Sequence, residues 1–255
     1  MTRRRYALTL EYDGAPFVGW QRQDGALSVQ RVLEEAAARL NGGAPTAAVA
    51  AGRTDSGVHA EGQVAEIEVA AELPPERVRE ALNFHTRPHP VSVVRAAFAP
   101  PGWNARFSAV RRGYRYRILN RRPRPALDAG RVWHVGQRID AEAMHAAAQA
   151  LLGRHDFSAF RAASCQAKSA ERTLDRLSVS RLGDEVVVFA EARSFLHHQV
   201  RNLVGTLAMV GQGRRGPEWP RRVLDGRDRA KAGQTAPAEG LCFVFVRYEV
   251  EPEWR

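Results

Sequence analysis

Cysteine and long apolar runs are scarce in this sequence. The 255 residues include only Cys165 and Cys242, which stand far apart and lack any CxxC or Cys/His spacing. Isolated cysteines of this kind predict neither a disulfide framework nor a structural metal site. No run of eighteen apolar residues occurs, and the start passes from MTRRR directly into an alternating segment. We therefore expect no membrane span and no signal peptide, and a cytoplasmic protein.

Lysine is equally scarce, although the chain is basic. Lys168 and Lys231 are the only lysines among 38 basic residues, which stand against 28 acidic ones and give a formal net charge of +10. Arginine binds phosphate oxygens through two parallel hydrogen bonds and stacks on bases, so this excess favours a nucleic-acid partner. A codon bias towards arginine would explain the shortage of lysine but not the excess of positive charge. Charge alone leaves both interpretations open.

The first part of the chain alternates strands and helices. Residues 6–12 alternate apolar and polar side chains, as a half-buried strand does. A helix is predicted over 27–43, because Ser28 can cap its start and Gly42 can end it. The other predicted elements are strands near 46–51, 63–70 and 91–98 and a helix near 74–83. The order is strand, helix, strand, strand, helix, strand.

Residues 99–104, APPGWN, interrupt this pattern with two prolines and a glycine. We predict the domain boundary there, with domains of residues 1–104 and 105–255. The second part is predicted to contain a strand at 113–119, a helix at 140–153, a hairpin at 172–192, a helix at 194–213 and a strand at 241–250. The hairpin is expected to turn at Gly183 and Asp184. A strand near 131–135 and a short helix near 219–226 are also indicated.

With these last two elements left out, the same order of elements occurs twice. It predicts an α+β fold of two ferredoxin-like (split βαβ) units, with mainly antiparallel sheets packed side by side. Ligand sites tend to fall where two such units meet, so we expect the active-site cleft between them.

Asp55 is the first candidate for chemistry, in the loop AGRTDSGVHA at 51–60. Asp, Ser and Gly are residues that turns favour, so a plain turn is one interpretation. The other is a carboxylate nucleophile that the nearby Arg53 keeps ionised. Gly52 and Gly57 would let the backbone of this loop pass close to a ligand.

Tyr114 and Arg201 are two further candidates. Tyr114 alternates with Arg115 along a predicted strand, which is typical either of a core tyrosine or of a ring that stacks on a base. Arg201 lies in the helix predicted over 194–213, where it would share a face with His197 and Gly205. It is either a solvated arginine or the charge partner of a buried carboxylate.

Other chemistries find little support. His85 and His89 flank a proline without a third metal ligand. The loop around Asp55 lacks the lysine and spacing of a P-loop, and no GxGxxG follows a predicted strand. Ser56 has no GxSxG context. We expect neither a cofactor nor a metal.

Five segments of the chain carry a resemblance: EYDGAPFVGWQRQ, AGRTDSGVHAEGQV, ARFSAVRRGYRYRILN, LLGRHDFSAF and SFLHHQVRNLVGTLAMVG. In this order they are similar to segments of the tRNA pseudouridine synthase A family, over nearly the whole chain. Trp103 and Asn104 stand where that family usually has Phe and His. The family's fold of two ferredoxin-like domains agrees with the order of elements above.

The resemblance implies isomerisation of uridine to pseudouridine in tRNA, at positions 38, 39 and 40 of the anticodon stem-loop, without a cofactor or metal. The family's nucleophilic aspartate falls on Asp55, and the tyrosine that packs on the target uracil falls on Tyr114. The arginine that pairs with the nucleophile falls on Arg201, and the one that handles the flipped nucleotide falls on Arg53. A homodimer and no membrane partner are also implied. A catalytically silent RNA-binding protein and an aspartate-nucleophile hydrolase are the competing hypotheses.

Overall fold

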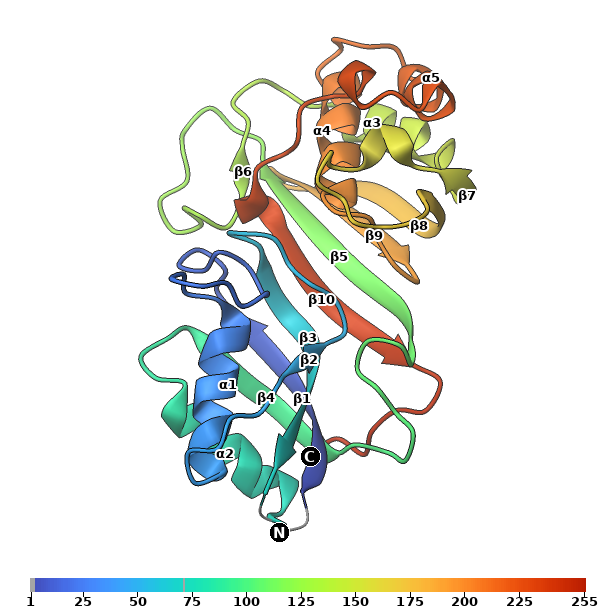
Figure 1. Ribbon diagram of the computed structural model, residues 1–255. Coiled ribbons are helices and arrows are strands. Elements are labelled where there is room, and N and C mark those ends of the chain that lie inside the picture. The colour runs from blue at the N-terminus through green and yellow to red at the C-terminus, as the bar shows by residue number, and fades with distance from the viewer. Residues whose placement is uncertain (1–2, 71) are drawn as a thin grey trace. The chain divides into compact units, whose positions relative to one another are not determined.

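The computed structural model describes residues 3–70 and 72–255 (Figure 1). By their contacts the residues form two compact units: unit 1 is Met1–Val110 together with Phe243–Arg255, and unit 2 is Arg111–Cys242. The predicted division was 1–104 and 105–255. The difference arises because the last strand returns most of its length to the sheet of unit 1. None of the helices formed by the described residues has the length and apolar character that a bilayer span needs.

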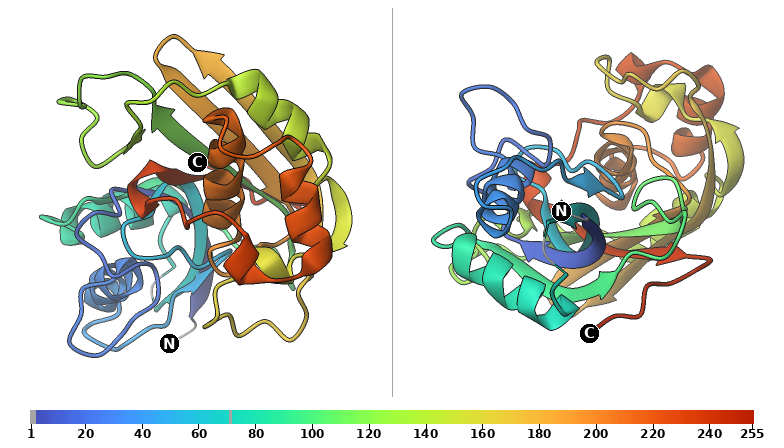
Figure 2. Two further views of the ribbon diagram at one scale, coloured as in Figure 1. Left: turned by 90° about the horizontal axis from the view of Figure 1, so that it is seen from above. Right: turned by 60° about the horizontal axis from the view of Figure 1, so that its bottom comes forward.

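Unit 1 is an antiparallel sheet covered by two helices. Its elements are β1 (Arg4–Tyr12), α1 (Val29–Leu40), β2 (Val49–Ala50), β3 (His59–Val69), α2 (Pro75–His85), β4 (Val91–Phe98) and most of β10 (Leu241–Tyr248). The strand order is β4-β1-β3-β10, and β2 pairs with β3. Strand β1 pairs antiparallel with both β3 and β4. Helices α1 and α2 lie on the same side of this sheet (Figures 1 and 2).

Local signals account for most element boundaries in unit 1. The Ser28 side chain caps α1 by accepting a hydrogen bond from the Arg31 amide at 3.2 Å, as predicted. Just beyond α1, Gly42 and Gly43 both have positive φ. Helix α2 begins at Pro75, where the missing amide hydrogen costs nothing. The strand predicted near 63–70 is longer than expected and begins at His59, directly after the loop that carries Asp55.

The core of unit 1 includes residues from both ends of its sequence. Trp103 and Tyr248 are buried, and their ring centroids are 4.9 Å apart. The Tyr248 hydroxyl donates to the Ala105 carbonyl at 2.8 Å. Small buried residues pack around the two rings: Ala7, Ala51, Val64, Ala105 and Ala109. Packing of the C-terminal strand therefore completes this core.

Trp103 buries an unsatisfied hydrogen-bond donor in that core, and its substitution tests the packing. Within the described residues its indole Nε1 has no hydrogen-bond acceptor, although the ring is only 3% exposed. Trp103→Phe removes ring volume but also a buried unsatisfied donor, which costs about 1–3 kcal/mol. We expect the unfolding free energy to change by less than about 1 kcal/mol, against a loss of about 3–5 kcal/mol for Trp103→Ala. Urea denaturation measures both, and equal losses would contradict this account.

Unit 2 is also a sheet with helices packed on it. Its elements are β5 (Ala109–Leu119), β6 (Trp133–His134), α3 (Ala141–Gln149), β7 (Gly153–Asp156), β8 (Glu171–Leu182), β9 (Glu185–Ala192), α4 (Gln199–Gly211), α5 (Trp219–Gly226) and the start of β10. The strand order is β5-β9-β8-β7, and β6 pairs with β5. Strands β8 and β9 form the predicted hairpin around Gly183, whose φ is +56°. The α+β class with mainly antiparallel pairing is thus confirmed.

Two details of unit 2 differ from the predictions. Helix α3 is capped by Asp140 as expected but ends at Gln149, and Gly153 begins the short unpredicted strand β7 instead of ending the helix. Helix α4 begins only at Gln199. His198 precedes it with a φ of 62°. This left-handed backbone conformation is incompatible with a right-handed α-helix, so the helix cannot extend back through His198.

Candidate active site

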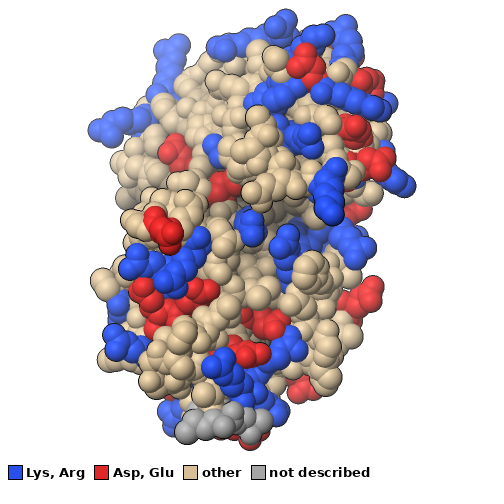
Figure 3. All heavy atoms as spheres, in the orientation of Figure 1, with Lys and Arg blue, Asp and Glu red and all other residues tan. Residues whose placement is uncertain are grey.

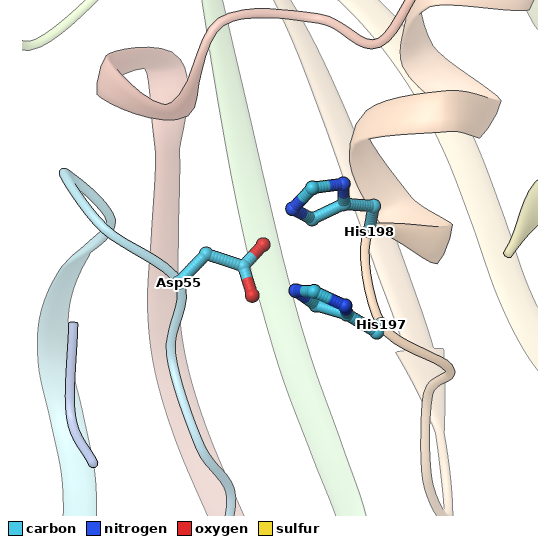
Figure 4. Close-up of side chains that lie close together, drawn as sticks. All are labelled: Asp55, His197 and His198. Carbon is cyan, nitrogen blue, oxygen red and sulfur yellow. The ribbon is translucent and has the colours of Figure 1, made fainter. Parts of the chain in front are cut away.

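Asp55 lies in a tight turn between β2 and β3 of unit 1. The Val58 amide donates to the Asp55 carbonyl at 3.1 Å, and Gly57 in between has a φ of +76°. Asp55 also forms an isolated antiparallel bridge with Gly19. Its half-buried side chain projects from the loop, with both carboxylate oxygens at the tip (Figure 4). The turn interpretation and the presentation of a carboxylate are therefore compatible.

A second loop, residues 13–20, supports the Asp55 loop along its length. The Trp20 amide donates to the Thr54 carbonyl at 3.0 Å, and the Ser56 hydroxyl donates to the Phe17 carbonyl at 3.3 Å. The Gly14 amide donates to Nδ1 of His59 at 3.0 Å. This contact gives His59 a structural part in fixing the loop. The EYDGAPFVGWQRQ segment thus contains backbone support for the Asp55 loop.

Two glycines allow residues 13–20 to pack closely against the Asp55 loop. A Cβ at Gly14 would lie 2.1 Å from the Val58 carbonyl oxygen, and one at Gly19 would lie 2.6 Å from the Thr54 carbonyl oxygen. Gly19 also has a φ of +109°, which favours glycine. Sequence reasoning did not single out these two residues. The only available signal was two glycines within one of the five resembling segments.

Buried polar groups on the strands of the sheet also hold the Asp55 loop. The Tyr12 hydroxyl lies 2.8 Å from Thr54 Oγ1, and both residues are buried. The fully buried Gln63 donates from Nε2 to the Gly52 carbonyl at 2.7 Å. Since Tyr12 lies on β1 and Gln63 on β3, two sheet strands fix the backbone on which Asp55 stands. Such a supported loop holds a reacting group in a defined direction.

Arg53 stands two residues before Asp55 in this loop. It is exposed, and within residues 3–70 and 72–255 it forms no ion pair. That Arg53 keeps the Asp55 carboxylate ionised stays a prediction, and so does a contact of Arg53 with a bound nucleotide. Lys and Arg side chains are numerous on the face drawn in Figure 3.

Tyr114 and Tyr116 both lie on β5 in unit 2 but differ in their surroundings. The Tyr116 hydroxyl donates to the Pro237 carbonyl at 2.7 Å. Burial raises the pKa of this hydroxyl, and the positive charge of the nearby Arg201 offsets part of that rise. Tyr116 is thus a core residue. Tyr114 is 8% exposed, and its ring meets the Phe195 ring edge-on at a centroid distance of 5.2 Å. Of the two, Tyr114 is the ring that retains some accessible surface.

Arg201 lies in the first turns of α4 and is half-buried. Its Nε donates to the Ala236 carbonyl at 2.8 Å, so the side chain is held by a backbone acceptor. The prediction that His197 shares a helix face with Arg201 is wrong, because His197 precedes the helix. Figure 4 shows His197 and His198 on the segment that leads into α4.

The predicted site residues thus fall into two groups. Unit 1 carries Arg53 and Asp55, and unit 2 carries Tyr114 and Arg201. Taken one unit at a time, the described part of the chain gathers no three side chains that could together bind a metal ion. The arrangement offers a supported carboxylate in one unit, and an aromatic ring and an oriented guanidinium in the other.

Comparison with known proteins identifies relatives over nearly the full length. A family model described as tRNA pseudouridine synthase matches residues 9–108 and 147–249. A protein of Acidiphilium cryptum named tRNA pseudouridine synthase A is 62% identical over 98% of this chain and 98% of its own length. A protein of Rhodospirillum centenum with the same name is 57% identical over 96% of this chain and 100% of its own length.

Proposed function

The chain belongs to the tRNA pseudouridine synthase family, whose members are isomerases, and on this premise we propose which uridines it modifies and how. It converts uridine to pseudouridine in tRNA. We assign the reaction to positions 38, 39 and 40 of the anticodon stem-loop, with Asp55 as the nucleophile and no cofactor. The single observation that carries the role of Asp55 is its presentation on a loop fixed from two sides, by residues 13–20 and by the buried Tyr12 and Gln63.

The chemistry explains why a carboxylate and an aromatic ring are needed. The C1′–N1 bond must break, the uracil must turn, and C5 must join C1′, so the nucleotide has to leave the base stack and remain bound meanwhile. Asp55 acts at the sugar or assists loss of its 2′ proton. Tyr114 packs on the detached uracil, and Arg201 keeps the Asp55 carboxylate ionised once water is excluded. Arg53 binds the flipped nucleotide.

Tyr114 provides a test of the stacking role. Tyr114→Phe keeps the aromatic face, and we expect tRNA affinity close to that of the unsubstituted protein. Tyr114→Ala is expected to lose roughly 1–3 kcal/mol of tRNA binding, the usual contribution of one stacked base. Filter binding with unmodified tRNA measures both affinities. Equal affinities for the two variants would argue against stacking by Tyr114.

The direct test of the proposed function is incubation of the protein with unmodified tRNA, followed by chemical mapping of pseudouridine. We expect modification confined to positions 38, 39 and 40. Binding of tRNA without any pseudouridine would favour the catalytically silent RNA-binding protein, and modification elsewhere would refute the assigned positions. A homodimer and a location in the cytoplasm, where tRNA is available, accompany this proposal.

A further inference from the structure

Residues 233–237 of unit 2 lie along the helix that carries Arg201. The Ala236 amide donates to the Arg201 carbonyl at 3.1 Å, and Arg201 Nε donates back to the Ala236 carbonyl at 2.8 Å. The Gly233 amide donates to Thr206 Oγ1 at 3.0 Å. At the other end, the Pro237 carbonyl accepts from Tyr116. Ala236 therefore binds both the backbone and the side chain of Arg201.

This segment approaches α4 more closely than side chains would allow. A Cβ at Gly205 would lie 1.8 Å from the Gln234 carbonyl oxygen, closer than any real contact. A Cβ at Gly233 would lie 2.7 Å from both the Gly205 carbonyl oxygen and the Thr206 Cα. Glycine in mid-helix costs about 1 kcal/mol relative to alanine, so Gly205 is kept here at the expense of helix stability. The close approach brings the Ala236 carbonyl within reach of Arg201.

Arg229 binds both this segment and helix α4. Its guanidinium donates to the Gly233 carbonyl at 2.9 Å, and to Asn202 Oδ1 and Thr235 Oγ1 at 3.0 Å each. Thr235 in turn donates to Asn202 Oδ1 at 2.7 Å. All these acceptors are neutral, and burial lowers the Arg229 pKa. A half-buried cation with neutral partners cross-links residues 233–237 to α4 through hydrogen bonds and not through an ion pair.

We propose that residues 233–237, held by the Gly205 contact and by Arg229, position the Arg201 guanidinium for the isomerisation reaction. The inference rests on the proposed function, in which Arg201 acts on Asp55. Arginine has a long side chain with about 2 kcal/mol of rotamer entropy. A bond at Nε fixes the plane of the guanidinium, and with it the direction of the two terminal nitrogens. Arg229 is thus a positioning residue that need not touch the substrate.

The first test is Gly205→Ala, with Gly226→Ala as its matched control. Both replace a helical glycine, but a Cβ at Gly226 would meet nothing within 4 Å. Gly205→Ala pushes Gln234 away and is expected to lower kcat about 100-fold, since a misplacement of about 1 Å has that effect. The KM and the Kd for tRNA should change little. Gly226→Ala should keep kcat within roughly twofold.

A second readout separates positioning from a general effect on the fold. In the Arg201→Lys background the Nε bond to Ala236 no longer exists, so Gly205→Ala should then lower kcat by less than about threefold. A further 100-fold loss there would overturn the inference, because residues 233–237 would be acting through something other than Arg201. Unchanged kcat for Gly205→Ala in the unsubstituted protein would overturn it as well.

The third readout requires no turnover. The Arg201 Nε–H signal in a ¹⁵N NMR spectrum, assigned by its absence in Arg201→Lys, should persist in Gly226→Ala and disappear through fast exchange in Gly205→Ala and Arg229→Met. Arg229→Lys keeps one donor and should retain part of the signal intensity. Persistence of the full signal in Gly205→Ala would refute the positioning. If the unsubstituted protein forms no pseudouridine, the proposed function fails, and this signal still tests the positioning by itself.

Discussion

Asp55→Asn is expected to abolish pseudouridine formation while tRNA binding changes by less than about 1 kcal/mol. The amide has nearly the shape of the carboxylate, so the turn closed by Val58 and the bridge to Gly19 should survive. An amide oxygen carries no negative charge with which to attack the sugar or take its 2′ proton. The loss should therefore appear in kcat, measured by release of the C5 hydrogen label from tRNA.

Asp24→Asn is the matched control for this variant. Asp24 is an exposed aspartate in another loop of unit 1, and its replacement makes the same change in charge. We expect normal turnover for Asp24→Asn, together with a melting temperature close to that of the unsubstituted protein for both variants. Wild-type turnover of Asp55→Asn would remove Asp55 from the chemical step.

Gly14→Ala is expected to cause the second-largest loss, although Gly14 lies outside the Asp55 loop. Gly14 has no positive φ, so alanine can adopt its backbone conformation, and the effect comes from space alone. The added methyl carbon would lie 2.1 Å from the Val58 oxygen and 2.4 Å from the Val58 carbonyl carbon. One of the two loops must move. We expect kcat to fall at least about 100-fold and stability to fall by about 1–3 kcal/mol.

Gly25→Ala serves as the control, because it strains the backbone without crowding a neighbour, whereas Gly14→Ala crowds a neighbour without straining the backbone. Gly25 has a φ of +73° with nothing within 4 Å of its Cβ position, so alanine there is strained but not crowded. It should cost about 1 kcal/mol of stability and leave kcat unchanged. Thermal melts and turnover with unmodified tRNA distinguish the two variants. If Gly14→Ala retained full activity, the support of the Asp55 loop by residues 13–20 would not matter for catalysis.

Elements with strong local signals could be predicted from the sequence. Ser28 and Asp140 cap their helices as expected, and the hairpin turns at Gly183, because each depends on contacts within a few residues. The start of α4 was missed, since the apolar spacing continues through residues 194–198 while His198 turns left-handed. The return of most of β10 to unit 1 was also not predicted. The partner of a C-terminal strand is set by residues more than 150 positions away, which local patterns do not encode.

The candidate site residues could be predicted from the resemblance to a known family better than from the chemistry of the individual residues. Taken alone, the Asp55 loop indicated a turn, and the structure contains that turn. Its value as a site depends on contacts with Gly14 and Gly19, which join segments about 40 residues apart. Likewise, the alternation along β5 could not tell Tyr114 from Tyr116, because contacts with distant residues distinguish them: Tyr116 donates to the Pro237 carbonyl, and Tyr114 packs on Phe195. The roles of Asp55, Tyr114, Arg53 and Arg201 stay predictions that the variants above address.

The division of β10 between the two units has a consequence for biosynthesis. Phe243–Arg255 complete the sheet and core of unit 1, and they are synthesised only after the whole of unit 2. Unit 1 therefore cannot finish folding when its first 110 residues have been translated. It must wait until unit 2 has been synthesised and the missing strand follows. A chain truncated after residue 242 would leave the edge of β3 open and Trp103 without Tyr248. Chains that stop before this strand thus cannot complete unit 1, which makes them ready substrates for proteolysis.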